Sequence, residues 1–156
     1  MTRLNRSLAG ALQGQTYVTA GLAMIDARAG VIDYASAGHM PPYLLNEDRL
    51  EEVEVSSLPL GVSAAVVYRE RRVSFPAGAR FVMYTDGMVE CAGADGEMLG
   101  FDRFEKLLMT MDVRLEPGEQ MKALMERVDA AAVSSEEADD RTIVLIERSR
   151  RAAGDL

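Results

Sequence analysis

The sequence feature that most constrains this chain is a short apolar run that ends in a turn signal, RFVMYTDGMVE over residues 80–90. A run of this kind, bounded by a turn signal, is typical of a buried β-strand. Asp86 follows the predicted strand, and Gly87 lets the backbone turn sharply behind it. The sequence therefore predicts a carboxylate at the C-terminal edge of a strand. Asp-Gly is also a common tight-turn dipeptide, so taken alone this motif favours a plain turn.

Composition and charge limit what a site at this position can be. The 156 residues and the hydrophobic share of 48% predict one globular domain with a real core. The 25 acidic and 17 basic residues give a net charge of -8, which argues against nucleic acid or an anionic membrane as the main partner and favours cations. The single Cys91 excludes an internal disulfide and any site of several cysteines. No apolar stretch has membrane-spanning length and no signal-peptide region is present, so we expect a cytoplasmic location.

Hydrophobic periodicity predicts antiparallel strands followed by paired helices. A short helix is expected over residues 4–12 and a loop over 57–65. Two more helices are expected over 101–111 and after Pro117. The expected strands are 17–26 and 31–37 (a hairpin), 43–45 and 50–55 (a second hairpin), 66–75, 80–84 and 142–147. This order predicts an α+β domain rather than a doubly wound sheet.

A second acidic motif can meet Asp86 in space. If the strands 80–84 and 142–147 are antiparallel neighbours, the end of the first lies beside the start of the second, and Asp86 meets Asp139 and Asp140. Converging carboxylates repel each other unless a cation or protons neutralise them, and oxygen ligands suit a hard divalent ion such as Mg²⁺ or Mn²⁺. The Asp139-Asp140 pair fits a solvated acidic loop equally well.

Six ordered segments carry a resemblance to a known family: TYVTAGLAMID, YASAGHMPPYLL, LPLG, FPAGARFVMYTDGMVE, MLGFDRF and DDRTIVLIER. With these segments the chain resembles the bacterial SpoIIE/RsbU-type branch of the PP2C (PPM) metal-dependent serine/threonine phosphatases. The resemblance implies a β-sandwich of two antiparallel sheets flanked by helices over residues 1–148. The chain end over 149–156 is expected to be a flexible tail.

The same resemblance implies roles for particular residues. Asp86 and Asp139 are implied to be ligands of one metal ion, with Asp140 beside them as a further contributor. Two Mn²⁺ or Mg²⁺ ions in such sites activate a water that attacks the phosphorus of a phosphoserine or phosphothreonine. The implied substrate is a phosphorylated bacterial regulator of the anti-sigma-factor antagonist type. Gly38 and His39 match a family hallmark, for which we expect a structural role in a turn.

One departure from the family pattern limits the expected activity. Family members carry an early Gly-Asp-x-x-Asp motif whose first Asp bridges both metals, whereas the first acidic residue here is Asp26. We therefore expect the N-terminal strands of the fold to be missing, at most half of the metal site to be present, and activity to be weak or absent. Open sheet edges would favour a homodimer. The alternative function is a non-catalytic, degenerate phosphatase-like binding module.

Three further features are left open by the sequence. Arg69, Arg71 and Arg72 could dock a phosphoprotein, but we expect a solvated strand face. Glu90 follows Asp86 by four residues, and either the same cleft or the open surface fits it. Gly61 lies in a loop that borders the cleft in one interpretation and serves only structure in another.

Overall fold

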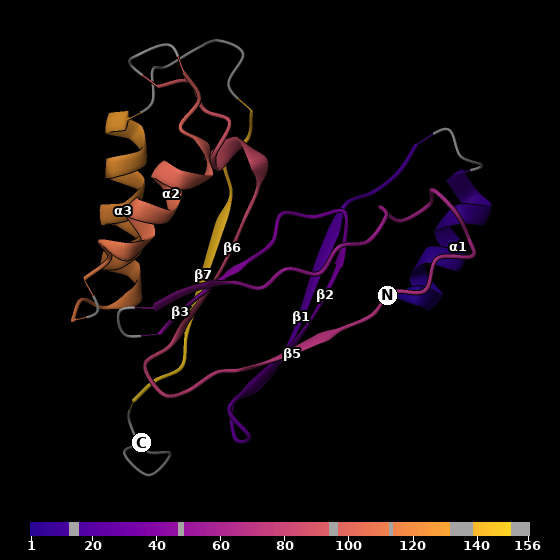
Figure 1. Ribbon diagram of the computed structural model, residues 1–156, viewed down its shortest axis with the longest axis horizontal. Helices are drawn as coiled ribbons and strands as arrows, with labels where there is room; N and C mark the ends of the chain where they lie inside the picture. The colour runs from indigo at the N-terminus through magenta and orange to yellow at the C-terminus, as the bar shows by residue number, and fades with distance from the viewer. Residues whose placement is uncertain (13–15, 47–48, 94–96, 113, 132–138, 151–156) are drawn as a thin grey trace. The chain divides into compact units, whose positions relative to one another are not determined.

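The computed structural model describes residues 1–12, 16–46, 49–93, 97–112, 114–131 and 139–150. The chain forms two compact units. Unit 1 comprises Met1–Pro41 and Val53–Pro76, and unit 2 comprises Pro42–Glu52 and Ala77–Leu156. Each unit contains one antiparallel sheet (Figure 1). Within the described ranges, no helix is long and apolar enough to cross a membrane.

Unit 1 consists of one helix and a three-stranded sheet. Its elements are α1 (Thr2–Leu12), β1 (Ala20–Asp26), β2 (Val31–Ala37) and β5 (Arg71–Ser74). The strand order is β1-β2-β5, so β2 is the central strand among the described residues. The predicted hairpin of β1 and β2 is confirmed, with Asp26 paired to Val31 across the turn. Gly30 closes this turn with a φ of 68°, a left-handed conformation that favours glycine.

Burial in unit 1 follows β2 more than β1. Ile32 and Tyr34 of β2 are fully buried, whereas Leu22 and Met24 of β1 are 53% and 65% exposed. The buried residue of α1 is Asn5. Its amide donates to Ser63 O at 2.9 Å, and its Oδ1 accepts from Gly61 N at 2.9 Å. The polar side chain therefore joins α1 to the 57–65 loop, which the apolar spacing of the helix did not indicate.

One predicted strand is shorter than expected. Residues 66–75 were expected to be a single strand, but β5 begins only at Arg71, and Val67 is 67% exposed. The reason lies in the hydrogen bonds of the segment before β5. Tyr68 N donates to Thr2 Oγ1 of α1 at 3.1 Å, so this part of the chain bonds to the helix rather than to a neighbouring strand.

Unit 2 consists of a four-stranded sheet with two helices. Its strands are β3 (Tyr43–Asn46), β4 (Arg49–Glu52), β6 (Arg80–Tyr84) and β7 (Ile143–Glu147), in the order β4-β3-β6-β7. The helices α2 (Gly100–Met109) and α3 (Pro117–Ala131) pack side by side, with α2 against β4 and α3 against β7 (Figure 1). A 3₁₀ turn, η1 (Asp86–Met88), follows β6. The second hairpin and the two helices are confirmed, although β4 ends at Glu52, short of the predicted strand over 50–55.

The core of unit 2 lies between β6 and the helices. Val82 of β6 is fully buried on the same face of the strand as Tyr84, whereas Phe81 is fully buried on the opposite face. The ring of Tyr84 packs against Phe104 of α2, with 4.8 Å between centroids. Leu108, Leu124 and Val128 complete the helical contribution, as their spacing predicted, whereas Phe101 is 47% exposed.

A buried ion pair joins the start of β6 to the end of β7. The side chain of Arg80 is 2% exposed, and its Nη2 lies 2.9 Å from Glu147 Oε2. Gln120 of α3 donates from Nε2 to the same carboxylate oxygen at 3.4 Å and to Leu115 O at 2.5 Å. The sequence placed Arg80 in an apolar run without indicating this network.

The predicted α+β order of antiparallel strands and paired helices is confirmed. Several predictions lie partly or wholly outside the described residues. They concern the turn at 47–48, part of the 92–96 loop, the acidic loop up to residue 138, and the tail from 151.

Candidate metal centre at the ends of β6 and β7

Asp86 occupies the position that the sequence predicted, directly after β6 and at the start of η1. Its carboxylate is exposed, and its Oδ1 accepts from Gly87 N at 3.0 Å. Its carbonyl oxygen accepts from Val89 N at 2.8 Å and from Glu90 N at 2.9 Å. The backbone of the turn is therefore internally bonded, while the carboxylate faces outward.

The Asp139-Asp140 pair precedes the strand that neighbours β6. The β6 and β7 strands are antiparallel, and the register pairs Tyr84 with Ile143. This pairing confirms the predicted adjacency of the two strand ends. Both aspartates are exposed, and Asp139 Oδ1 accepts from Asp140 N at 2.8 Å.

The backbone of this acidic pair lies against the turn that carries Asp86. A Cβ placed on Gly87 would lie 2.7 Å from Asp140 O and 3.2 Å from Asp139 O. Real Cβ atoms essentially never come within 3.0 Å of such an atom. Gly87 is therefore required for close approach of the two segments, which is a different reason from the sharp turn that the sequence suggested.

The chemistry of these donors suits a hard divalent cation, but their number does not complete a site. Carboxylate oxygens are the ligands that Mg²⁺ and Mn²⁺ prefer. Within the described part of the chain, no group of three or more His, Cys, Asp or Glu side chains is arranged to hold a metal ion. Asp86, Asp139 and Asp140 are therefore not arranged as a three-carboxylate site, and their role as metal ligands stays a prediction.

Thr85 is a residue of this region that the sequence reasoning missed. Its Oγ1 accepts from Thr142 N at 2.9 Å and donates to Asp140 O at 3.1 Å. The signal for it was present in the sequence, since Thr85 directly precedes Asp86 in the TDG segment and Thr142 follows Asp140 by two residues in the DDRT segment.

Gly38, His39 and Gly61 lie in unit 1, whereas Asp86 lies in unit 2. His39 N donates to Ser36 Oγ at 3.1 Å, and Ser36 Oγ donates back to His39 O at 3.2 Å. Gly38 has a φ of 69°, and a Cβ there would lie 2.7 Å from Pro59 Cγ. Gly61 has a φ of 90° and packs in the same way on Leu12. The structural role expected for Gly38 and His39 stays a prediction, and Gly61, left open by the sequence, packs on α1.

Arg71 and Arg72 are consecutive residues of β5, so their side chains leave opposite faces of the strand. Arg72 bonds Asp33 on β2 with two contacts of 2.7 Å, and its side chain is 68% exposed. This hydrogen-bonded guanidinium lowers the pKa of Asp33. Arg69 is exposed, and Arg71 is partly exposed. Glu90 is exposed as well, and its backbone rather than its carboxylate bonds Asp86.

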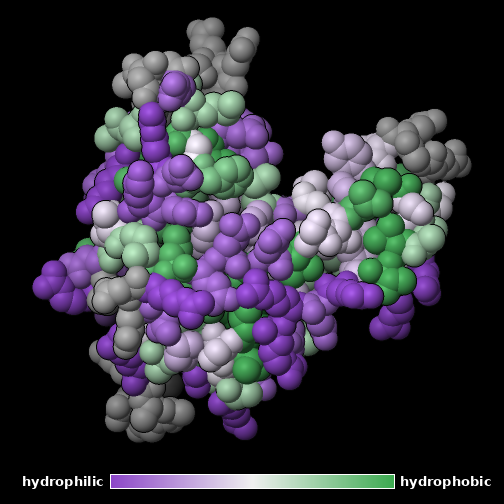
Figure 2. All heavy atoms as spheres, viewed as in Figure 1, coloured by the Kyte–Doolittle hydropathy of each residue, from purple (hydrophilic) through white to green (hydrophobic). Residues whose placement is uncertain are grey.

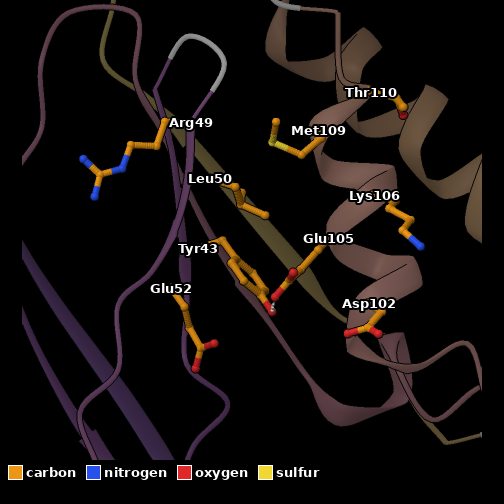
Figure 3. Close-up of a pocket in the computed structure, with 9 residues that line it drawn as sticks. All are labelled: Tyr43, Arg49, Leu50, Glu52, Asp102, Glu105, Lys106, Met109 and Thr110. Carbon is orange, nitrogen blue, oxygen red and sulfur yellow. Dashed lines mark hydrogen bonds between the residues drawn. The ribbon is translucent and has the colours of Figure 1, made fainter.

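A pocket of about 700 Å³ opens elsewhere in unit 2, between the β3–β4 hairpin and α2 (Figure 3). Tyr43 Oη donates to Glu105 Oε1 at 2.9 Å across its base. Burial, reinforced by this hydrogen bond, raises the pKa of Tyr43. None of Asp86, Asp139 and Asp140 belongs to the lining, which consists of Tyr43, Arg49, Leu50, Glu52, Asp102, Glu105, Lys106, Met109 and Thr110.

The sequence matches the model of a known protein family. The family described as "Stage II sporulation protein E (SpoIIE)" matches residues 1–149. No curated protein matches the sequence.

Solved structures share the fold. The SiaA-PP2C domain of Pseudomonas aeruginosa has a TM-score of 0.80 at 24% identity, over 92% of this chain and 57% of that one. The RsbU and RsbW domains of a Mycobacterium tuberculosis protein have a TM-score of 0.73 at 22% identity, over 92% of this chain and 40% of that one. The phosphatase domain of SpoIIE from Bacillus subtilis, presoaked with Mn, has a TM-score of 0.62 at 20% identity, over 86% of this chain and 58% of that one. The chain thus spans between 40% and 58% of the length of these structures.

Proposed function

The chain belongs to the SpoIIE family, and from this premise we propose that it is part of a metal-dependent serine/threonine protein phosphatase domain. The observation that carries the proposal is the meeting of two acidic motifs at one end of the β6–β7 pair. Asp86 follows β6, Asp139 and Asp140 precede β7, and the two segments are in backbone contact at Gly87. The PP2C fold of the structural neighbours supports it.

In this proposal, Asp86 and Asp139 hold Mn²⁺ or Mg²⁺, and Asp140 contributes beside them. A metal ion held there would supply an activated water and neutralise charge on the phosphoryl group. Both carboxylates are exposed at the end of the sheet, where a phosphorylated side chain on another protein can reach them. The lone histidine is not needed, since His39 serves a turn in unit 1.

The proposed substrate is a phosphorylated bacterial regulatory protein of the anti-sigma-factor antagonist type, and the proposed location is the cytoplasm. The RsbU and SpoIIE domains among the structural neighbours support a regulatory role. The net charge of -8 is consistent with a protein substrate rather than nucleic acid.

We further propose that these residues form one part of the metal centre and that the chain by itself is a weak phosphatase or an inactive one. Two or three carboxylates bind Mg²⁺ poorly when the ion must shed water. The absence of a three-ligand group among the described residues supports this. The test is hydrolysis of a phosphoserine peptide by the 156-residue chain with and without Mn²⁺. A rate near the buffer background is expected, and robust Mn²⁺-dependent hydrolysis would overturn the claim of a partial site.

A second candidate is a degenerate phosphatase-like module that binds a partner without hydrolysing it. The same incomplete ligand set favours it. NMR of the chain in the presence of Mn²⁺ separates the two candidates. Selective paramagnetic broadening at Asp86 and Asp139 supports the phosphatase proposal. Uniform weak broadening over all exposed carboxylates supports the binding module.

A homodimer through open sheet edges is also proposed. β1 is one of the two edge strands of its sheet among the described residues, and Tyr17, Leu22 and Met24 are 63%, 53% and 65% exposed. Figure 2 shows further hydrophobic residues at the surface around α1. An exposed apolar edge strand is a ready template for pairing. Sedimentation velocity is expected to show a dimer, and a monomer at all concentrations would contradict this proposal.

A further inference from the structure

We propose that Thr85 is the positioning residue of this site: its hydroxyl holds the Asp139-Asp140 segment at a set distance from Asp86. The inference rests on the proposed function for its link to metal binding. The geometry that carries it, however, concerns only the backbone around Thr85, Asp140 and Thr142.

At the end of the β6–β7 ladder, a side-chain oxygen replaces a backbone carbonyl as hydrogen-bond acceptor. After the pair Tyr84–Ile143, Thr85 and Thr142 are the next residues in register. A hydrogen-bonded antiparallel pair exchanges two backbone bonds. One of them is made, from Thr85 N to Thr142 O at 3.0 Å. The Thr85 carbonyl points into the 3₁₀ turn instead, where it accepts from Met88 N at 3.0 Å, and Thr142 N does not bond to it.

The Thr85 side chain takes the place of that carbonyl. Thr142 N donates to Thr85 Oγ1 at 2.9 Å, which is an ordinary hydrogen-bond length. The chain can therefore leave the strand and turn at Asp86 while the partner strand stays paired for one more residue. The turn that presents Asp86 and the ladder that anchors β7 are compatible because of this hydroxyl.

The same hydroxyl then reaches the acidic pair. A hydroxyl has one donor and two acceptor sites. With Thr142 N as its donor partner, Thr85 Oγ1 uses its own hydrogen toward Asp140 O at 3.1 Å. Asp140 O is also the atom that would lie 2.7 Å from a Cβ on Gly87. The acidic segment is thus bonded by Thr85 and limited sterically at Gly87.

The two residues that make these contacts, Thr85 and Gly87, directly precede and follow Asp86 in the sequence. Loss of the Thr85 hydroxyl would leave Thr142 N and Asp140 O without their partner and release the acidic segment from the turn. Residues that orient metal ligands without touching the metal typically change affinity by about 10–100-fold when mutated. We expect about a tenfold loss of Mn²⁺ affinity on this ground.

The experiment compares Thr85→Val, which keeps the side-chain shape, with Thr85→Ser, which keeps the hydroxyl. Thr110→Val is the matched control, because Thr110 Oγ1 donates to Leu107 O at 2.7 Å and accepts from Arg127 Nη1, neither of which belongs to the acidic segment. Two readouts are taken on the full chain. Amide hydrogen exchange at Thr142 reports the hydrogen bond itself. Paramagnetic broadening by Mn²⁺ alone, titrated at Asp86 and Asp139, reports the affinity.

Thr85→Val is expected to speed exchange at Thr142 about tenfold, since a bond to a buried or structured donor contributes this much protection. It should also weaken the Mn²⁺ effect, while Thr85→Ser restores both readouts and Thr110→Val changes neither. Unchanged exchange in Thr85→Val would overturn the positioning role. Absence of site-selective broadening in the unchanged chain would instead overturn the proposed metal function, and the exchange data would still decide whether Thr85 holds the segment. Should Thr85→Val not fold, failure of Thr85→Ser to keep the unchanged chain's exchange and affinity would overturn the inference.

Discussion

The backbone of Asp140 lies so close to Gly87 that it leaves no room for a side chain at position 87. A Cβ on Gly87 would lie 2.7 Å from Asp140 O. This contact binds the end of β6 to the segment before β7, two elements that are more than fifty residues apart in the sequence.

Gly87→Ala is therefore expected to destabilise the chain and to move the acidic segment. The obstructing atom is backbone, which cannot rotate away as a side chain would, and overpacking of this kind costs about 1–3 kcal/mol. Urea denaturation measures the loss. Gly118→Ala is the matched control, because nothing lies within 4 Å of a Cβ there. Since Gly118 lies in α3, this change is expected to be stabilising by up to about 1 kcal/mol. Equal stabilities for the two variants would contradict the close contact at Gly87.

Neutralising one carboxylate of the proposed metal centre, Asp86 or Asp139, should change metal binding without changing the fold. Asp86→Asn and Asp139→Asn are each expected to abolish selective Mn²⁺ broadening, because an amide oxygen carries no charge to hold the ion. Both side chains are exposed, so the free energy of unfolding should change by less than about 0.5 kcal/mol. The control is Asp102→Asn, an exposed aspartate of α2 in the same unit. If Asp102→Asn reduces the broadening as much, the Mn²⁺ effect is nonspecific.

The Arg80–Glu147 pair is expected to be far more important for stability than the surface pairs. Glu147→Gln leaves the nearly fully buried charge of Arg80 without its carboxylate, and breaking a buried pair costs about 3–5 kcal/mol. Lys122 and Glu126 form an exposed pair at 4.0 Å, so Glu126→Gln should cost less than about 0.5 kcal/mol. Urea denaturation of both variants gives the comparison. A loss below about 1 kcal/mol in Glu147→Gln would mean that water or another group replaces the carboxylate.

Alkaline pH is expected to destabilise unit 2 through Tyr43. Burial raises the pKa of Tyr43 above its ordinary value of 10.0. The folded phenol therefore keeps its proton where the unfolded one loses it. The stabilising contribution is complete below about pH 10 and declines as the pH rises above it. Tyr43→Phe should show a shallower decline of stability between about pH 10 and 12.

Tyr17→Phe serves as the control for this pH dependence, because Tyr17 is 63% exposed. Thermal denaturation at each pH is the measurement. Parallel pH profiles for Tyr43→Phe and the unchanged chain would show that Tyr43 is not responsible for the decline.

Local sequence patterns predicted most of the helices and strands. The apolar run 80–84 ending at Asp86 became β6, and the helical spacing of Phe104, Leu108, Leu124 and Val128 became the buried faces of α2 and α3. Both follow from short-range chemistry, since a strand or a helix buries residues at a fixed period along its own chain. The adjacency of Asp86 to the acidic pair could be stated only on the condition that β6 and β7 are neighbours.

Longer-range decisions could not be predicted in this way. The shortening of the predicted 66–75 strand follows from a bond between Tyr68 and Thr2, and Leu22 and Met24 are exposed on one face of β1. Burial of Arg80 depends on Glu147 and Gln120, each on a different element. No periodicity within a single segment contains this information.

The sequence by itself determined the order of the elements, the position of Asp86 at a strand end, and the family to which the motifs belong. The tertiary structure alone decided that Tyr84 pairs with Ile143, that the Thr85 hydroxyl replaces a backbone carbonyl, and that Gly87 touches Asp140. The physical reason is that each of these depends on the register between strands far apart in the chain. A shift of one residue in that register would send every side chain of β7 to the opposite face.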